Sequence, residues 1–498
     1  MKQDRRQFLI KSGCALSMLA LATQARHFGM MSALAQTMEN KSSDDSFAPS
    51  DYRALVCIFL SGGNDGNNMI VPNHSDANIS NYAAYAATRA TQGLAIPQNQ
   101  LLPISVPRLG NLTYGLNPNF GAVTGQPNNG IHELWAQGKL GVVANTGNLI
   151  RPMTKTQYQQ QPAWRPYQLF SHSDQVQQQQ TARSDDRAYL GWGGRMADLS
   201  NAANNPGALV PMITSIAGTQ LFTQGRSTTP LAIASGNVAL NQTLVLQGFG
   251  TDARSVARRT ALAELRTIDL DSQVVAAASN ITNQAQSASN ALSTFQEVTA
   301  TFPNTTLGNQ LKQVARVIKK RTDLSINRQV FFVQLGGFDT HQNQLAVNGQ
   351  TGLFIQLSQA MRAFYDEMGA QGIQDKVTQF TLSDFGRTMN PAGTGAIVGS
   401  DHAWGNHMLV LGGSVVGGNV YGSTRPDGTG NVFPTFQLGG PDDIDTGTNP
   451  RGRWLPTTSV EQYAATLGRW FGLTDADLPI VFPNIGNFAN SNLGFMNP

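Results

Sequence analysis

Five apolar runs without polar alternation are the feature that most constrains the fold of this chain. A strand with one wet face alternates apolar and polar residues, whereas a continuous run indicates burial on both faces, as in a parallel sheet covered by helices. An amphipathic pattern over residues 353–372 predicts a helix between the third and fourth runs, which gives a strand–helix–strand unit. The sequence therefore predicts an α/β fold with a doubly wound, mostly parallel sheet. The runs are RALVCIFL (53–60), LGVVANTG (140–147), QVFFVQL (329–335), VTQFTL (377–382) and HMLVLGG (407–413).

Residues 253–322 differ from the rest of the chain in being rich in Ala, Ser, Gln and Asn. Their apolar residues recur at helical spacing, which favours a packed helical insertion over disorder. Near the C-terminus, Ser459 and Gln462 form a capping-box pattern for a last helix that ends at Gly472. We therefore expect one α/β domain over residues 51–498, with a helical insertion at about 253–322.

The first residues predict export from the cytoplasm. Arg5 and Arg6 precede a short apolar stretch and a small-residue cleavage pattern, so residues 1–35 resemble a twin-arginine signal peptide. The alternative is an ordinary secretory signal with a basic start. Residues 36–50 are polar and are expected to form a flexible linker. We expect the twin-arginine machinery to export a folded protein to the periplasm or beyond, without a stable membrane span after cleavage.

Charge and cysteine content exclude two classes of function. The formal net charge is +3 and no dense Lys/Arg tract is present, so nucleic acid is not expected as a partner. Of the two cysteines, Cys14 would leave with the signal peptide, and Cys57 lies in an apolar run. The mature chain therefore has neither an intramolecular disulfide nor a multi-cysteine metal site.

Polar side chains cluster where the predicted strands end. Ligands of open α/β sheets bind outside the carboxyl ends of the strands. Carboxylate and imidazole donors together suit Zn²⁺ or Mn²⁺, while Mg²⁺ and Ca²⁺ prefer oxygen. We therefore predict a divalent metal centre (Zn, Mn, Mg or Ca) with one or two ions, although each short motif alone could be a hydrogen-bonded loop pair. The residues are Asn64 and Asp65 after the first run, Asp339 and His341 after the third, Asp384 and Arg387 after the fourth, and Asp401, His402 and His407 around the start of the fifth.

Several motifs identify a family. The segments FLSGGNDGNNMIVP, GGFDTHQNQ, SDFGRT and GSDHAWGNHMLVLGG resemble the exported bacterial domain-of-unknown-function family 1501, whose members carry twin-arginine signals. The resemblance runs from about residue 51 to the C-terminus. That family is in turn similar to the alkaline phosphatase and sulfatase superfamily, as a remote relative. This similarity implies an alkaline-phosphatase-like fold and hydrolysis of phosphate or sulfate esters with one or two divalent ions.

The resemblance also implies roles for single residues. Asp65, Asp339, His341 and Asp384 match metal ligands of the superfamily, and His402 or His407 would match its final histidine. Two departures are evident in the sequence. Phe385 stands where the superfamily usually has a histidine ligand, so Asp401 or His402 would have to substitute in a second metal site. Asp339 and His341 are also closer in sequence than the usual spacing.

A nucleophile is harder to assign. The superfamily attacks with Ser, Thr or a modified Cys at a helix N-terminus. Ser171, followed by His172, precedes a predicted helix and is our candidate, with Ser173 and Thr154 as alternatives. The competing interpretation is that Ser171 only caps the helix. Cys57 lies inside a predicted strand and not at a helix N-terminus, so its position does not suit a nucleophile. Arg387 or Asn64 would stabilise the oxyanion.

The sequence thus favours a metal-dependent periplasmic hydrolase of phosphate or sulfate esters, acting on a small molecule or a glycan. The alternative is a non-catalytic metal-binding or envelope assembly protein on the same scaffold, because fold does not dictate function. A third possibility is a carbohydrate- or envelope-processing role in which residues 253–322 select the substrate.

Overall fold

The structure is a computed structural model and describes residues 51–243, 252–265, 279, 283, 286–292 and 297–497. The predicted signal peptide (1–35) and linker (36–50) lie outside the described residues. Among the helices of the described part, none has both the length and the apolar content needed to cross a bilayer.

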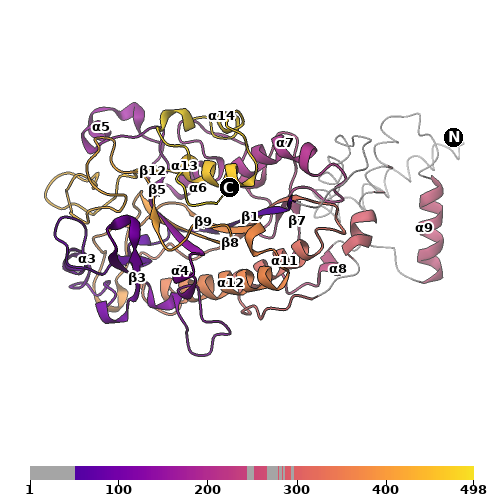
Figure 1. The fold of residues 1–498 in the computed structure, drawn as a ribbon, viewed down its shortest axis with the longest axis horizontal. Helices are drawn as coiled ribbons and strands as arrows, with labels where there is room; N and C mark the ends of the chain where they lie inside the picture. The colour runs from indigo at the N-terminus through magenta and orange to yellow at the C-terminus, as the bar shows by residue number, and fades with distance from the viewer. Residues whose placement is uncertain are drawn as a thin grey trace, which may run out of the picture.

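A nine-stranded sheet forms the centre of the fold, in the order β11-β5-β10-β9-β1-β8-β6-β7, with β12 also paired to β5. β10 runs antiparallel to both of its neighbours, and the other pairings are parallel. The prediction of a mostly parallel sheet is therefore confirmed (Figure 1). The strands are β1 (Arg53–Leu60), β5 (Leu140–Gly147), β6 (Ile213–Ser215), β7 (Leu231–Ala232), β8 (Arg328–Leu335), β9 (Val377–Ser383), β10 (Asn406–Gly412), β11 (Val420–Tyr421) and β12 (Thr458–Ser459).

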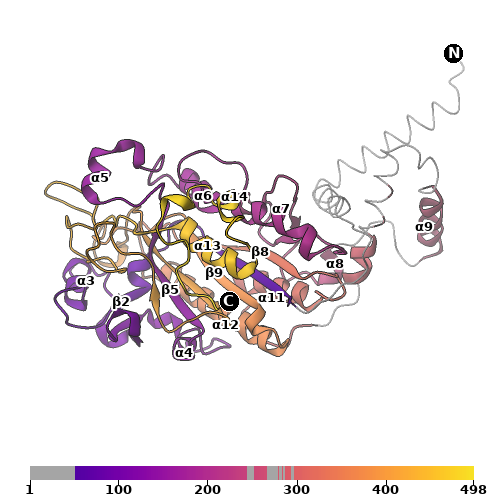
Figure 2. The same ribbon diagram turned by 45° about the horizontal axis from the view of Figure 1, so that its top comes forward.

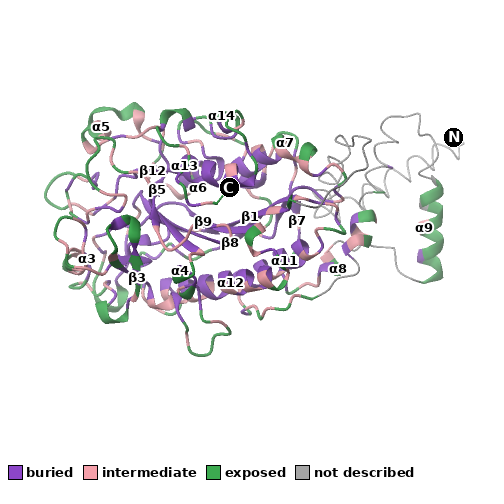
Figure 3. Ribbon diagram, viewed as in Figure 1, coloured by how far each residue is buried: buried purple, intermediate pink, exposed green. Residues whose placement is uncertain are grey.

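Two apolar cores, one on each face of the sheet, explain why β1 has no polar alternation. Ala54, Val56 and Ile58 belong to the core that includes α11 and α12. Leu55 and Cys57 belong to the core that includes α7 and α13. Every side chain of the strand interior is therefore removed from water, as the purple sheet between two helical layers shows (Figure 3).

Helices cover both faces, which confirms the doubly wound arrangement (Figure 1). The capping box of Ser459 and Gln462 is present at the start of α13, and Gly472 ends that helix with φ of 125°. One layer contains α11 (Thr306–Lys319) and α12 (Gln350–Ala370), and the other contains α6 (His172–Thr181), α7 (Trp192–Asn204), α13 (Val460–Phe471) and α14 (Leu478–Val481).

The segment 253–322 contributes helices of two kinds. α9 (Ala253–Leu265) lies apart from the sheet in both views (Figure 1 and Figure 2). α11 instead packs in the layer beside α12, where Leu307, Leu311 and Val314 are buried in the core. The last helix of the predicted insertion is thus part of the layer that covers the sheet.

A second, three-stranded antiparallel sheet was not predicted; its strands lie between β1 and β5 in the sequence. Its strands β2 (Ile70–Pro72), β3 (Leu102–Val106) and β4 (Leu112–Leu116) are short and two of them contain proline, so they give little periodic signal. Short helices complete the described fold: α3 (Tyr82–Arg89), α4 (Glu133–Ala136), α5 (Lys155–Gln160) and α8 (Leu240–Thr243).

The register of the central strands brings three loops to one edge. Leu60 of β1 pairs with Leu335 of β8 and with Ser383 of β9, so the loops that follow begin at the same level. Gly62 (φ 114°) lies so close to the next loop that an added Cβ would meet the backbone nitrogen of Asp339 at 2.4 Å. Only glycine fits there, because the position combines a left-handed φ with this close approach. The three loops consequently form one surface at the carboxyl edge.

Candidate metal centre

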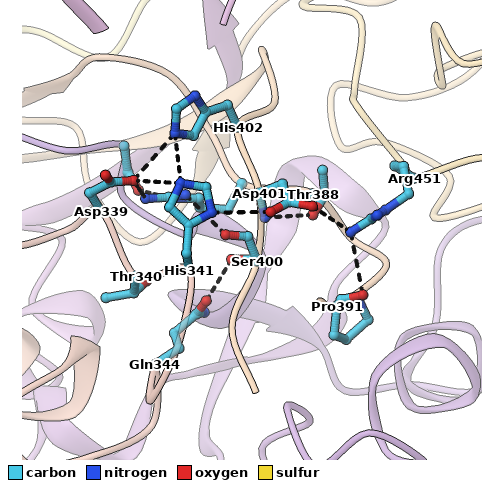
Figure 4. A network of polar contacts seen from close by, with 12 residues as sticks. Asp339, Thr340, His341, Gln344, Thr388, Pro391, Ser400, Asp401, His402 and Arg451 are labelled. Carbon is cyan, nitrogen blue, oxygen red and sulfur yellow. Dashed lines mark hydrogen bonds and ion pairs between the residues drawn. The ribbon is translucent and has the colours of Figure 1, made fainter. Parts of the chain in front are cut away.

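Four potential ligand atoms converge at this edge: Nε2 of His172, His341 and His402, and Oδ1 of Asp339. The Nε2 atom of His402 lies 3.1 Å from that of His172 and 3.0 Å from that of His341. The carboxylate oxygen lies 3.3 Å from His402, 3.1 Å from His341 and 3.5 Å from His172. His172, Asp339 and His402 offer ligand atoms that all lie within 4.8 Å of one another. Figure 4 shows His341 and His402 directed toward Asp339.

Hydrogen bonds alone do not account for this convergence. A ring nitrogen carries either one hydrogen or one lone pair, yet Nε2 of His402 has three polar neighbours within 3.3 Å. At most one of those contacts can use its single hydrogen. A cation between the atoms would accept the lone pairs of His172, Asp339 and His402 at once, with His341 beside them.

The opposite ring nitrogens are all held by acceptors. Nδ1 of His172 lies 2.7 Å from Oδ2 of Asp384, and Nδ1 of His341 lies 3.1 Å from Oδ1 of Asp401. Nδ1 of His402 lies 2.8 Å from the carbonyl oxygen of Phe170. In metal sites, histidine ligands almost always donate their second N–H to a carboxylate or carbonyl in this way. Such bonds place the hydrogen on Nδ1 and leave the Nε2 lone pair free.

The four donors come from three distant parts of the chain. Asp339 and His341 follow β8, His402 precedes β10, and His172 is the first residue of α6. Asp384, directly after β9, ties α6 to the edge, because its Oδ1 accepts the N–H of Gly62 at 3.1 Å while its Oδ2 holds His172. From the sequence, His172 was a candidate only as the neighbour of Ser171. The structure places it among the converging donors.

The local electrostatics differ among the donors. The hydrogen bond that His172 donates to Asp384 raises the pKa of His172 against the effect of burial. Burial lowers the pKa of His402, helped by the charge of Arg387. For Asp339, burial opposes ionisation, but the hydrogen bond and charge of Arg387 outweigh it and lower the pKa. Asp339 is therefore an anion with a side chain that is 47% exposed, accessible from solvent.

Arg387 holds the three loops together from inside. Its side chain is fully buried. It donates to the carbonyl oxygens of Gly62, Gly63, Phe338 and Ser400 at 2.9 to 3.0 Å, and also to Oδ1 of Asp339. Backbone carbonyls and Asp339 thus occupy the guanidinium, which positions Asp339. In this structure Arg387 does not present the fork geometry toward solvent that binding an oxyanion would need.

Phe385 packs against the rings of two of the histidines. Its ring centroid lies 4.8 Å from that of His172 and 4.7 Å from that of His402. The side chain is 1% exposed and offers no ligand atom. At this position the chain therefore has an apolar support beneath one cluster of donors, where the resemblance implied a further ligand.

Comparison with protein families decides the relationship of this chain. The model of a family described as "Protein of unknown function (DUF1501)" matches residues 52–477. The chain belongs to the DUF1501 family. The family predicted from the motifs is thus confirmed over most of the sequence.

Two solved structures with low sequence identity are similar to the DUF1501 chain. No curated protein matches it. Among solved structures, it is similar to the C-terminal periplasmic domain of EcEptC from Escherichia coli in complex with Zn, with 12% identity, 74% of this chain and 75% of that chain covered, and a TM-score of 0.29. It is also similar to the PsFucS1 sulfatase from Pseudoalteromonas sp., with 8% identity, 79% and 68% covered, and a TM-score of 0.25. At TM-scores below 0.5, these similarities carry no argument about the chemistry of the DUF1501 chain.

Asp65 of the DUF1501 chain lies in a separate buried ion pair. Its Oδ2 accepts from Arg89 at 2.6 Å and from Gln344 at 2.6 Å, and its Oδ1 accepts from Arg89 and from the N–H of Asn67, each at 3.1 Å. Both side chains of the ion pair are 0% exposed. The structure therefore does not bring Asp65 to the converging donors, and it gives this residue an architectural role beneath them.

We expect Asp65→Asn to lower the free energy of unfolding by about 3–5 kcal/mol, because the variant leaves the Arg89 charge buried without its partner. The metal content of the folded variant should equal that of the wild type, as measured by elemental analysis. Asp366→Asn breaks a partly exposed pair with Arg362 and serves as control, with an expected loss below about 1 kcal/mol. Loss of metal at full stability would instead make Asp65 a ligand.

His407 and Asn64 also lie apart from the converging donors. His407 is on β10, where its Nδ1 accepts the N–H of Asn145 at 3.1 Å and its ring stacks on Phe433. Burial lowers the pKa of His407 to about 3, so it is a neutral interior histidine. Asn64 is 0% exposed and accepts from Gln350 at 3.2 Å. Both residues join loops and strands below the edge.

The hydroxyls considered as nucleophiles have local partners. Ser171 occupies the N-cap position of α6, but its Oγ donates to Asp174 at 2.7 Å and does not cap a backbone N–H. Oγ of Ser173 lies 3.2 Å from that of Ser171. Thr154 forms a complete capping box with Gln157 at the start of α5. Cys57 is buried, and its pKa is raised well above its usual value.

Proposed function

We propose that this DUF1501 protein is a metal-dependent hydrolase of phosphate or sulfate esters. One divalent cation would be held by His172, His341 and His402 together with Asp339. The observation that supports this proposal is the convergence of three Nε2 atoms and one carboxylate oxygen, with each Nδ1 held by its own acceptor.

The donor set fits a cation in spacing and chemistry. Around Zn²⁺ with ligand distances of about 2.0–2.1 Å, tetrahedral neighbours lie roughly 3.3 Å apart. Among His172, Asp339 and His402 the donor separations run from 3.1 to 3.5 Å, and Nε2 of His341 lies 3.0 Å from His402 and 3.1 Å from Asp339. Three imidazoles and one carboxylate favour Zn²⁺ or Mn²⁺ over Mg²⁺ or Ca²⁺, which prefer all-oxygen shells.

Each residue then has a definable task. When bound, such a cation supplies positive charge for an ester oxyanion and acidifies water. Asp384, Asp401 and the Phe170 carbonyl orient the imidazoles, and Arg387 orients Asp339. Phe385 keeps water from one side of two histidine rings. The half-exposed Asp339 marks the side from which an ester would approach.

The signal sequence predicted at residues 1–35 gives this hydrolase its place of action. Under the proposal the twin-arginine machinery exports the folded chain, and the enzyme acts in the periplasm or outside the cell. Changing Arg5 and Arg6 to Lys would retain the protein in the cytoplasm, which fractionation would measure.

The proposal is tested with the wild-type mature protein and two chromogenic esters, 4-nitrophenyl phosphate and 4-nitrophenyl sulfate. We expect turnover of one of them, its loss in a chelator, and its recovery with Zn²⁺ or Mn²⁺. His402→Ala should lower turnover at least about 100-fold, whereas His132→Ala, whose ring contacts the Pro103 carbonyl, should not. Folded protein without bound metal after chelator-free purification would end the proposal.

A second candidate function is metal binding without catalysis. It is favoured by two observations: the Ser171 hydroxyl is hydrogen-bonded to Asp174, and the Arg387 guanidinium is occupied by backbone carbonyls. Stoichiometric metal with no turnover on a broad panel of phosphate and sulfate esters would favour this candidate. Hydrolysis that disappears in His402→Ala would eliminate it.

A further inference from the structure

A polar pocket of about 620 Å³ lies away from the four converging donors. Side-chain amides and hydroxyls line it, with Ile216 as its one apolar side chain, and no lining residue is charged. Pockets that bind small molecules usually measure about 300–1,000 Å³ but are mostly apolar. The volume of the pocket is therefore typical of small-molecule sites, whereas its polar and uncharged lining is unusual for them. Four of the amides in the lining belong to Asn237, Asn304, Asn309 and Gln356.

The pocket lies where β6 and β7 end, on the same side of the molecule toward which β8 runs. Ile216 directly follows β6, and Ser235 lies three residues after β7. Both strands run parallel to β8, which leads into Asp339. β6 ends level with Phe332, three residues before β8 ends at Leu335, and β7 ends level with β6. The pocket therefore lies about 10 Å back along the strand direction and about 5 to 10 Å to the side of the end of β8, a span that takes several linked sugars rather than one.

The wall of the pocket is built in advance. The N–H of Gly236 donates to the carbonyl of Asn309 at 2.7 Å, and an added Cβ at Gly236 would meet that oxygen at 2.4 Å. The amide of Gln310 pairs with both backbone groups of Gln334 on β8, at 2.8 and 2.9 Å. α11 and the loop after β7 are thus fixed to the sheet, so a ligand meets a preformed surface.

We propose that this pocket binds a neutral saccharide, as the uncharged part of a phosphate or sulfate ester whose charged group lies at the metal centre. The link to the ester rests on the proposed function. Saccharide binding by the pocket does not depend on the proposed function.

The chemistry of the lining selects this ligand class. A carboxamide both donates and accepts hydrogen bonds, and so does each hydroxyl of a sugar. A charged group would find no counter-charge among the lining residues, and an apolar ligand would find only Ile216. Ser235 donates to Asn237 at 2.6 Å and Asn309 donates to Asn304 at 3.2 Å, and each amide keeps further donor and acceptor capacity. A ligand with many neutral hydroxyls can use that capacity at several amides together, which a charged or an apolar ligand cannot do.

The test is direct binding of cellotetraose, maltotetraose and chitotetraose, followed by saturation-transfer NMR and calorimetry. At least one should bind the wild type and Asp339→Ala alike, because the assay needs neither metal nor turnover. The double variant Asn237→Ala/Gln356→Ala should weaken that binding at least about tenfold, since it removes two amide groups. Gln160→Ala removes an exposed amide from α5 and should change nothing.

Two results would overturn the assignment. One is the absence of binding by all three tetrasaccharides up to about 10 mM. The other is equal binding by the wild type and by a double variant whose thermal melt shows it to be folded. Failure of ester hydrolysis, measured separately, would refute the proposed function and leave the binding result unaffected.

Discussion

Purified Asp339→Ala protein is expected to contain less than about a tenth of a divalent ion per chain, against about one in the wild type. Asp339 supplies the one carboxylate oxygen among the four converging donors, 3.1 to 3.5 Å from the three imidazole nitrogens. Its negative charge offsets half of the charge of a divalent ion, whereas the imidazole ligands are neutral. Elemental analysis after chelator-free purification measures the result.

Two variants make this result specific. Asp339→Asn keeps the size of the side chain and removes its charge, so it should lose most of the ion as well. Asp375→Ala alters an exposed carboxylate just before β9, whose other end leads into Asp384, and should keep the ion. Wild-type metal content in folded Asp339→Ala would contradict the centre described above.

The second large effect concerns Glu461 on α13. Its side chain is 0% exposed, and Asn484 supplies the neighbouring hydrogen-bonding groups, without an ideal hydrogen bond to either carboxylate oxygen. Burial raises the pKa of Glu461 to about 8, against a lowering effect of Asn484, whose amide donates to Asp185. The folded protein therefore holds this proton more tightly than the unfolded chain does.

The sign of the pH dependence follows from this difference. With a pKa near 4.5 unfolded and about 8 folded, the contribution to stability is complete below pH 4.5 and is lost as the pH rises to 8. The loss approaches roughly 5 kcal/mol, at 1.36 kcal/mol per pKa unit. We expect Glu461→Gln to remove most of this decline, so that the variant is more stable than the wild type at pH 8.5 and about equal at pH 4.5.

Urea unfolding at several pH values measures both profiles. Glu133→Gln is the control, because the Glu133 side chain is 47% exposed and its removal should leave the decline intact. Parallel curves for the wild type and Glu461→Gln would show that Glu461 does not titrate in this range.

The main strands could be predicted because they are long and apolar throughout. All five predicted runs are strands, and the register of β1 with β8 and β9 follows from parallel pairing. The antiparallel direction of β10 could not be predicted, since an apolar run looks the same in either direction. The short strands β6 and β7 have two or three residues and no measurable period.

For the candidate site, the sequence predicted which edge of the sheet carries the polar residues, but not which side chains contact one another there. Placing polar residues after strand ends grouped Asp339, His341 and His402, which the structure brings together. Sequence position could not distinguish a residue that binds a metal ion from a carboxylate that orients such a residue, as Asp384 does for His172. The ion pair of Asp65 depends on Arg89 of α3, in a region without a predicted element.

The hydrogen bonds by which Arg387 joins three loops have a consequence for biogenesis. They join backbone from residues 62–63, 338 and 400, which are neighbours only after the central strands have paired. Asp339 is held in place through this contact, so a chain still emerging from the ribosome has no centre to offer a cation. Under the proposed function, loading would follow folding, and export by the twin-arginine route would require the ion to be taken from the cytoplasmic pool before the protein leaves the cell.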